Sequence, residues 1–209
     1  MAAWLDLLTP DEIAGRLERV NAVPPARPRY DSPFPAGLLQ GAPIPAAVLM
    51  PLFRQEDAWR VLFIRRQAHL VEHSGQVAFP GGRADPDDRD AADTALREAW
   101  EEIGLAPDDV RLLGCLPPYL TITNYLVTPV IGLVPWPYAF RPAEDEVSRI
   151  FSIPLAWLAE PAHLERRWRQ LPAPHPPIDV LYFKEYDGEV LWGASAAFTL
   201  DFLNALRPA

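Results

Sequence analysis

The chain has 209 residues, of which 49% are apolar, and it carries a formal net charge of −9. The length fits one domain with an appended arm, and the composition supplies enough apolar residues for a substantial core, which excludes wholesale disorder. The acidic balance excludes a general nucleic-acid binder, because such a protein needs a basic surface to displace counterions from phosphates. A small anionic substrate remains compatible with it, since a metal ion and a few arginines can reverse the local field.

Two further features bear on covalent chemistry and location. Cys115 is the only cysteine, so the chain forms no internal disulfide and no cysteine-based zinc site. The amino terminus lacks the basic start and apolar stretch of a signal peptide, and no apolar run approaches the roughly 20 residues that span a bilayer. We therefore expect a cytoplasmic protein without membrane contact.

The amino-terminal part predicts a helix followed by a proline-rich arm. Residues Thr9–Glu12 are typical of a helix start, with Thr9 as the cap and proline in the first turn. Residues 22–45 are rich in proline, which stiffens a connecting segment. We assign residues 1–42 to this helix and arm together, and residues 43–209 to the main domain.

The next segment predicts strands that lead into a glycine pair. Residues 46–53 and 59–65 are typical of two strands joined by a turn at 55–57, and residues 76–79 predict a short strand. Pro80-Gly81-Gly82 then predicts a break in the chain that opens an acidic loop ending near residue 90.

The clearest helix covers residues 91–103, where apolar side chains recur at helical spacing, and Gly104 is a suitable stop. Further strands are expected at 109–116, 125–134 and 178–184, a turn at 143–147, and helices at 154–159 and 194–206. This mixture predicts an α/β or α+β fold with the 91–103 helix packed on a sheet.

Three glutamates on this helix form a candidate cation site. At about 100° per residue, Glu98, Glu101 and Glu102 span roughly 100° of arc, which predicts that they face away from the apolar stripe. Two like charges about 4 Å apart repel by about 4 kcal/mol at an effective dielectric constant near 20, and a divalent cation relieves that repulsion. Arg97 can reach Glu101 one turn away and orient a ligand. Three glutamates alone are more often an ordinary solvated acidic face.

The glycine pair favours the cation site over the solvated face. A Gly81-Gly82 turn lets the backbone approach a ligand closely, and its carbonyl, such as that of Gly82, is a further oxygen donor of the kind that Mg²⁺ prefers.

These residues together resemble the Nudix box, G-x5-E-x7-R-E-U-x-E-E-x-G-U, in which U is a large apolar residue. The matching residues are Gly82, Arg97, Glu98, Glu101, Glu102, Gly104 and Leu105. The resemblance implies a Nudix-type α/β/α sandwich around a mixed sheet, with the box as a loop–helix–loop, and hydrolysis of a nucleoside diphosphate linked to another moiety. It implies that Glu98 and Glu102 bind Mg²⁺ or Mn²⁺, that Glu101 supports or joins them, and that Arg97 orients them.

The sequence departs from the box at two places. The position of the loop glutamate holds Asp88, followed by eight rather than seven residues before Arg97, and the loop contains no glutamate. An aspartate of residues 85–90 can substitute, and the sequence leaves open which one. Ala99 occupies the large apolar position, a minor change in packing.

The segment before the box, residues 62–82, resembles the signature of coenzyme A pyrophosphatases within the family, L-L-T-x-R-[SA]-x3-R-x3-G-x3-F-P-G-G. The matches are Arg66, Gly75, Phe79, Pro80, Gly81 and Gly82, while Ile64, Gln67 and Val71 replace the threonine, the small residue and the second arginine. The resemblance implies cleavage of coenzyme A, or an acyl derivative, to 3′,5′-ADP and 4′-phosphopantetheine.

The resemblance also indicates candidate residues for substrate binding and for the catalytic base. Guanidinium groups pair with phosphate, so Arg65 or Arg66 is expected to bind the 3′-phosphate or the diphosphate. Nudix enzymes often place another glutamate on a late loop, as base or metal ligand, and Glu146 is the first candidate, ahead of Glu144. The alternatives are a Nudix hydrolase for ADP-ribose, NADH or a dinucleoside polyphosphate, and a non-catalytic Nudix-fold nucleotide sensor. The proline-rich arm and the tryptophans also suggest a homodimer.

Overall fold

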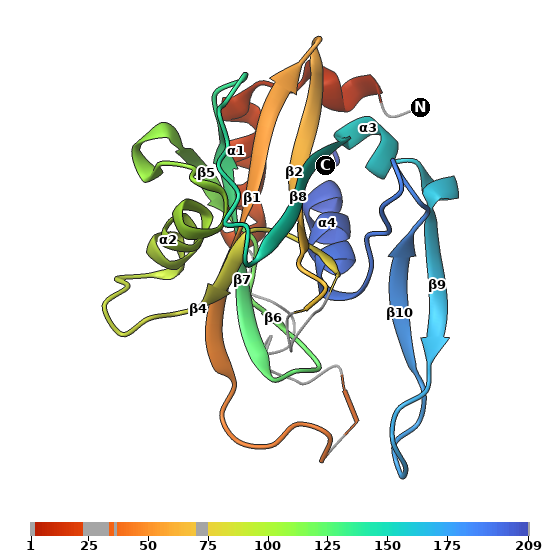
Figure 1. The fold of residues 1–209 in the computed structure, drawn as a ribbon. Helices are drawn as coiled ribbons and strands as arrows, with labels where there is room; N and C mark the ends of the chain where they lie inside the picture. The colour runs from red at the N-terminus through yellow and green to blue at the C-terminus, as the bar shows by residue number, and fades with distance from the viewer. Residues whose placement is uncertain (1–2, 23–33, 36, 70–74, 209) are drawn as a thin grey trace.

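The computed structural model describes residues 3–22, 34–35, 37–69 and 75–208. In this part of the chain, strands in the order β3-β2-β1-β7-β5 form a mixed sheet, in which β1 and β7 are parallel and the other neighbours antiparallel (Figure 1). Three further strands join it, with β4 on β1, β6 on β7 and β8 on β2. The strands of this sheet are β1 (Ile44–Gln55), β2 (Ala58–Arg66), β3 (Val77–Ala78), β4 (Gly81–Arg83), β5 (Arg111–Cys115), β6 (Tyr119–Leu120), β7 (Tyr125–Leu133) and β8 (Val147–Pro154).

Helices cover both faces of the sheet. Helix α2 (Ala91–Ile103) lies on one face, and α1 (Pro10–Ala22) and α4 (Gly193–Ala205) lie on the other (Figure 1). The short helix α3 (Leu155–Leu158) follows β8, and β9 (Leu164–Arg169) and β10 (Ile178–Phe183) form a separate antiparallel pair next to α4. The expected α/β/α sandwich around a mixed sheet is confirmed.

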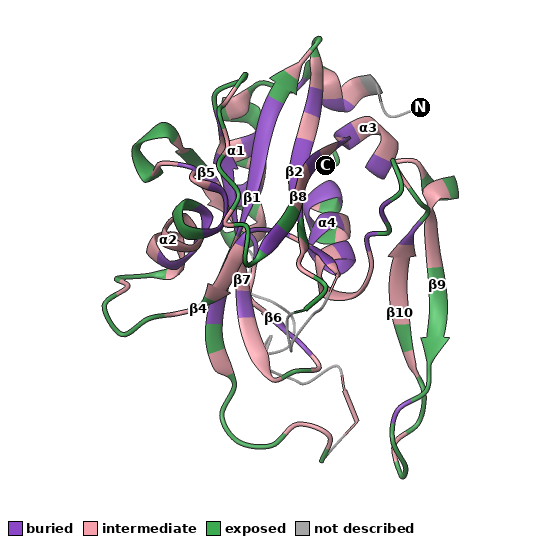
Figure 2. Cartoon of the chain, viewed as in Figure 1, coloured by how far each residue is buried: buried purple, intermediate pink, exposed green. Residues whose placement is uncertain are grey.

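The apolar runs of the central strands supply both layers of the core. Along β2, Val61 and Phe63 pack in the layer of α1 and α4, whereas Leu62 and Ile64 pack in the layer of α2. Successive strand residues point to opposite faces, so a strand buried on both sides is apolar throughout. Buried positions accordingly run along the centre of the sheet (Figure 2).

The amino-terminal helix begins as predicted. The Thr9 N–H donates to the Glu12 carboxylate at 2.8 Å, and the Glu12 N–H donates to the Thr9 hydroxyl at 3.2 Å, which is a complete capping box. Ile13 and Leu17 of α1 are buried in the same core as the sheet. Residues 23–33 of the proline-rich arm lie outside the described residues, and the division at residue 43 stays a prediction.

The strand prediction misses β6 and β9, and it is wrong at two places in the main sheet next to the site. The glycine pair continues the sheet, because Gly81–Arg83 forms β4 and pairs with β1. Residues 147–154, for which no strand was predicted, form β8 along β2. Both strands depend on partners far away in sequence, which local residue patterns do not encode. No helix in the described part of the chain is long and apolar enough to cross a membrane.

Candidate active site

Helix α2 carries the candidate site, and its ends are fixed by local interactions. The Asp90 carboxylate accepts hydrogen bonds from the backbone N–H groups of Ala92 at 2.8 Å and Asp93 at 3.0 Å. Gly104 ends the helix with φ of 65°, in the left-handed region that glycine adopts without strain. The predicted bounds of this helix, residues 91–103, are confirmed.

Glu98 lies against the backbone of strand β4. A Cβ atom added to Gly82 would lie 2.6 Å from the Glu98 carboxyl group, so only glycine leaves room for this contact. The Glu98 side chain is 17% exposed, and its Oε1 accepts a hydrogen bond from Arg97 Nη1 at 2.8 Å. Burial raises the pKa of Glu98, and the charges of Glu101 and Glu146 add to this effect.

Glu102 is buried, which corrects the expectation that all three glutamates face away from the core. Its side chain is 3% exposed. Its Oε1 accepts from Arg66 Nη1 at 2.9 Å, and its Oε2 accepts from the Gly81 N–H at 2.9 Å. Burial raises the pKa of Glu102 to about 7, against these two donors. The sequence does not reveal this burial because the groups that contact Glu102, at the end of β2 and on β4, are distant from it in the chain.

Glu101 lies on the outer side of the same helix. Its side chain is 56% exposed, and Arg97 Nη1 approaches it only at 3.4 Å. Of the three glutamates, Glu98 and Glu102 therefore line the boundary between α2 and the sheet, and Glu101 borders solvent.

Arg97 of α2 forms hydrogen bonds with the acidic loop that precedes this helix. Its Nε and Nη2 donate to both carboxylate oxygens of Asp88, at 3.0 Å and 2.9 Å. Asp88 also accepts from the Thr94 hydroxyl and the Asp85 N–H, both at 2.8 Å. The Arg97 guanidinium holds the pKa of Asp88 well below its usual range. Asp88 is thus the loop aspartate that pairs with Arg97, and Arg97 binds Asp88 more closely than the expected Glu101.

The turn at residues 143–147, which contains Glu146, is hydrogen-bonded to Gln67, the residue after β2. The Gln67 N–H donates to the Glu146 carbonyl at 2.8 Å, and the Gln67 side chain donates to the Glu144 carbonyl at 2.6 Å. Glu146 itself is exposed. Its charge raises the pKa of both Glu98 and Glu102, so its carboxylate acts on the same small region of the molecule. Val71, the departure in the signature segment, lies outside the described residues.

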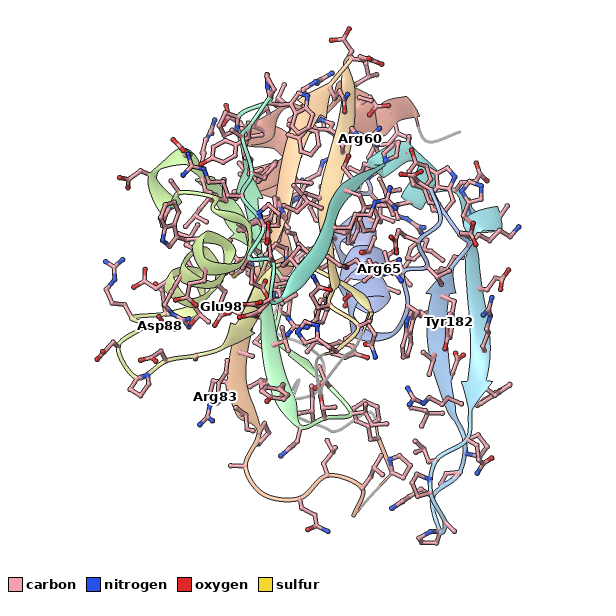
Figure 3. The ribbon with its side chains drawn as sticks, viewed as in Figure 1. Arg60, Arg65, Arg83, Asp88, Glu98 and Tyr182 are labelled. Atoms are coloured by element: carbon pink, nitrogen blue, oxygen red, sulfur yellow. The ribbon has the colours of Figure 1, made fainter. Side chains whose placement is uncertain are left out.

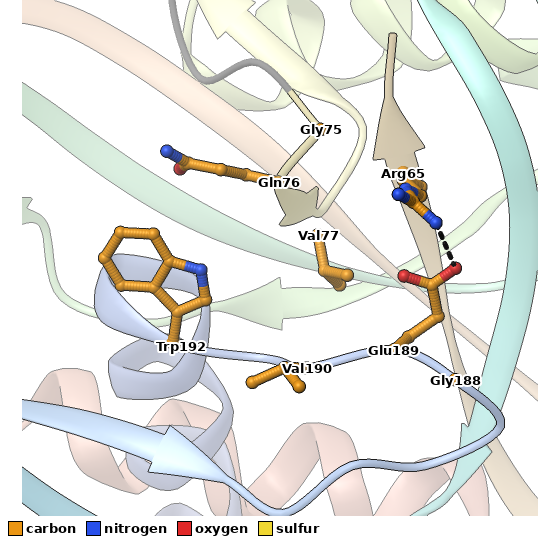
Figure 4. Close-up of a pocket in the computed structure, with 8 residues that line it drawn as sticks. All are labelled: Arg65, Gly75, Gln76, Val77, Gly188, Glu189, Val190 and Trp192. Atoms are coloured by element: carbon orange, nitrogen blue, oxygen red, sulfur yellow. Dashed lines mark hydrogen bonds and ion pairs between the residues drawn. The ribbon is translucent and has the colours of Figure 1, made fainter. Parts of the chain in front are cut away.

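Arg65 and Arg66 are neighbours on β2 with separate environments. Arg66 pairs with Glu102 on the α2 side, while Arg65 lies apart from Glu98, towards α4 (Figure 3). Arg65 lines a cavity of about 400 Å³ together with residues 75–77 and 188–190 and Trp192 (Figure 4). Its Nη1 lies 3.5 Å from the buried Glu189 carboxylate, which Arg149 also contacts, at 3.0 Å. No local sequence pattern indicates Glu189 or Arg149, because their contacts join segments distant in the chain.

The donor set suits a hard divalent cation. Glu98 and Glu102 are held on successive turns of α2, next to the backbone of a glycine pair, and burial and mutual repulsion oppose their ionisation. A cation with oxygen preference would relieve both effects. Each carboxylate is instead paired with an arginine, and no three acidic, histidine or cysteine side chains of the described residues are gathered into a ready cation cage.

Comparisons with known proteins point to one family. The family model of the NUDIX domain matches residues 43–174. The uncharacterized Nudix hydrolase NudL of Escherichia coli strain K12 is 39% identical over 159 residues, which cover 72% of this chain and 77% of that protein. NudL of Pectobacterium atrosepticum strain SCRI 1043 is 40% identical over 160 residues, covering 73% and 77%.

A solved structure, a MutT/nudix family protein from Enterococcus faecalis, is similar with a TM-score of 0.49 and 16% identity, covering 79% of this chain and 62% of that one. The family assignment depends on the sequence matches and on the position of the box residues on α2. Nudix hydrolases generally use divalent metal ions and act on nucleoside diphosphate linkages. The chain belongs to the Nudix hydrolase family and is a pyrophosphohydrolase.

Proposed function

We propose that this Nudix hydrolase uses Mg²⁺ or Mn²⁺ to cleave coenzyme A, or an acyl derivative, into 3′,5′-ADP and 4′-phosphopantetheine. The observation that carries the hydrolytic part is the contact of Glu98 with the Gly82 backbone, with Glu102 one turn further along the helix. The choice of coenzyme A is supported by the signature residues that end in this glycine pair.

In this proposal, Glu98 and Glu102 hold the metal ion, with Glu101 from the exposed side and the Gly82 carbonyl as a further oxygen donor. The metal ion, when bound, neutralises negative charge on the diphosphate and lowers the pKa of a coordinated water. Arg97 positions Glu98, because one of its nitrogens donates to that carboxylate while two others are fixed by Asp88.

The hydrolytic step needs a group that accepts the proton of the attacking water. We assign this role to Glu146, which is exposed and acts electrostatically on both Glu98 and Glu102. Water oxygen forms a bond to one phosphorus, the bridging P–O bond breaks, and the water proton passes to the Glu146 carboxylate.

The arginines on β2 provide contacts for the anionic substrate. Arg66 lies at the carboxylate site, so we assign it to the diphosphate. Arg65 lines the cavity with Trp192, whose indole stacks on Tyr182 at 5.5 Å, and we assign it to the 3′-phosphate. A rigid aromatic surface next to an arginine suits a nucleotide, because base stacking and phosphate pairing act together.

A product assay tests this proposal. The protein is incubated with Mg²⁺ or Mn²⁺ and, separately, with coenzyme A, acetyl-coenzyme A, ADP-ribose, NADH or a diadenosine polyphosphate, and products are identified by mass. We expect the highest kcat/KM with coenzyme A compounds, and 4′-phosphopantetheine or its acyl form as a product. Faster cleavage of ADP-ribose, NADH or the dinucleotide would reject coenzyme A as the substrate. Binding without products would indicate the sensor instead.

The homodimer and the cytoplasmic location remain predictions. Trp168 on β9 is 77% exposed, and Trp136 is 41% exposed, which provides apolar surface for a second copy. Light scattering after size-exclusion chromatography should then give twice the 23.4 kDa mass of the chain, and a monomer mass would contradict the homodimer.

A further inference from the structure

The half-buried Glu98 and the buried Glu102 each have an arginine as counterion. Arg97 pairs with Glu98 within the same helix, but Arg66 reaches Glu102 from the end of β2, 36 residues earlier in the chain. The second pair is the more enclosed, with side-chain exposures of 21% for Arg66 and 3% for Glu102. The tertiary fold thus places the positively charged Arg66 side chain next to the most buried glutamate of the box.

Both carboxylate oxygens of Glu102 are already in use. Arg66 Nη1 donates to Oε1, and the Gly81 N–H donates to Oε2, so each carboxylate oxygen already accepts a hydrogen bond. A divalent cation bound by Glu102 would need one of these oxygens. The Arg66 guanidinium carries a positive charge that repels such a cation, so the two compete for the same carboxylate.

Arg66 also has an unused donor. Its Nε–H is buried and has no hydrogen-bond acceptor among the described residues. Buried donors are nearly always paired, so this one calls for an explanation. Guanidinium Nε and Nη groups together form the two-pronged donor that matches phosphate oxygens. An Arg66 side chain that turned from Glu102 would present this pair to an anion at the same place.

We propose that Arg66 is a placeholder cation: it neutralises Glu102 in the metal-free enzyme, leaves that carboxylate when Mg²⁺ or Mn²⁺ binds, and then donates to the substrate diphosphate. This inference rests on the proposed function, because it takes Glu102 as a metal ligand. It explains why Arg66 pairs with Glu102, and it couples metal binding to the arrival of a diphosphate.

The proposal predicts opposite effects of one substitution on two ligands. For Arg66→Gln at pH 8.5, we expect Mn²⁺ to bind roughly tenfold more tightly in calorimetric titration, since a competing charge-assisted contact is removed. The manganese complex of inorganic pyrophosphate should bind the Mn²⁺-saturated variant at least about tenfold more weakly than wild type. An arginine that only orients Glu102 would weaken both.

Arg60→Gln is the matched control, because Arg60 lies on the same strand and its guanidinium is held by Ser152 on β8. It should change neither affinity. If Arg66→Gln does not fold, Arg66→Lys tests the proposal. Lysine lacks the forked geometry of the guanidinium and competes less well for Glu102, so this variant should bind Mn²⁺ about threefold more tightly than wild type. Unchanged or weaker Mn²⁺ binding in the folded Arg66 variant overturns the placeholder role. If the Glu102→Gln variant binds Mn²⁺ as tightly as the wild type, the proposed metal site is rejected instead.

Discussion

At residue 82 an added methyl group would overlap the Glu98 carboxyl and push the end of that side chain away from the backbone. For Gly82→Ala we expect kcat/KM to fall by about 100-fold, since a displacement of around 1 Å at a catalytic group has effects of this size. Steady-state kinetics with the best substrate of the product assay measures this.

Gly15→Ala is the control for the glycine substitution. Gly15 lies in α1 with nothing within 4 Å of an added Cβ. Alanine there should leave activity unchanged and stabilise the protein by about 1 kcal/mol, because alanine is the better helix former. Full activity in Gly82→Ala would mean that the Glu98 contact is not needed.

The residue scale also shows where sequence reasoning stops. The spacing of Glu98, Glu101 and Glu102 correctly places them on neighbouring turns of one helix. It could not show that Glu102 is buried and Glu101 exposed, because the contacts of Glu102 come from β2 and β4, which are distant in the chain. For the same reason the sequence pointed to Arg66 as a phosphate contact without revealing its pairing with Glu102.

At the level of elements, the acidic loop and α2 form one unit through the Asp88–Arg97 pair. Asp88→Asn removes the charge from a side chain that is 8% exposed and that Arg97 contacts at both oxygens. We expect the free energy of unfolding at pH 7 to fall by about 2 kcal/mol, measured by urea denaturation, because charge-assisted bonds are lost. A change within error would show that this pair does not fix the loop.

The same pair predicts a pH dependence. The pKa of Asp88 is lowered in the folded protein, so its stabilisation is present above the unfolded-state pKa near 4 and is lost as pH falls towards the folded-state pKa. Wild type should therefore lose stability more steeply than Asp88→Asn below about pH 4. Parallel acid-denaturation curves for the two proteins would contradict this assignment.

Elements with local signals were predicted more fully than those with distant partners. The α1 and α2 helices follow from capping residues and apolar spacing, and their observed starts agree with this. Strands β4 and β8 were missed because they exist through pairing with β1 and β2. A glycine pair predicts a turn locally, but here the sheet determines its conformation.

For the whole molecule, the sandwich brings the end of β2, strand β4 and helix α2 together at one place. A metal ion bound there should stabilise the folded state. At about 100 times the dissociation constant, the gain is about 2.7 kcal/mol, which corresponds to a rise in Tm of roughly 5–10 °C for a chain of this size.

Differential scanning fluorimetry with and without Mn²⁺ measures this rise. Glu18→Gln removes one carboxylate on the exposed side of α1, away from the site, and should keep the full shift. The double variant Glu98→Gln, Glu102→Gln should lose it. An equal shift in all three proteins would place the metal ion away from α2.

The central claim is that Glu102 serves metal-dependent cleavage of a diphosphate linkage, and the most direct test is the Mg²⁺-dependent turnover of Glu102→Gln. We expect the folded variant to release 3′,5′-ADP from coenzyme A at least about 100-fold more slowly than wild type at saturating Mg²⁺. A Glu102→Gln protein that kept most of its Mg²⁺-dependent turnover would contradict the account.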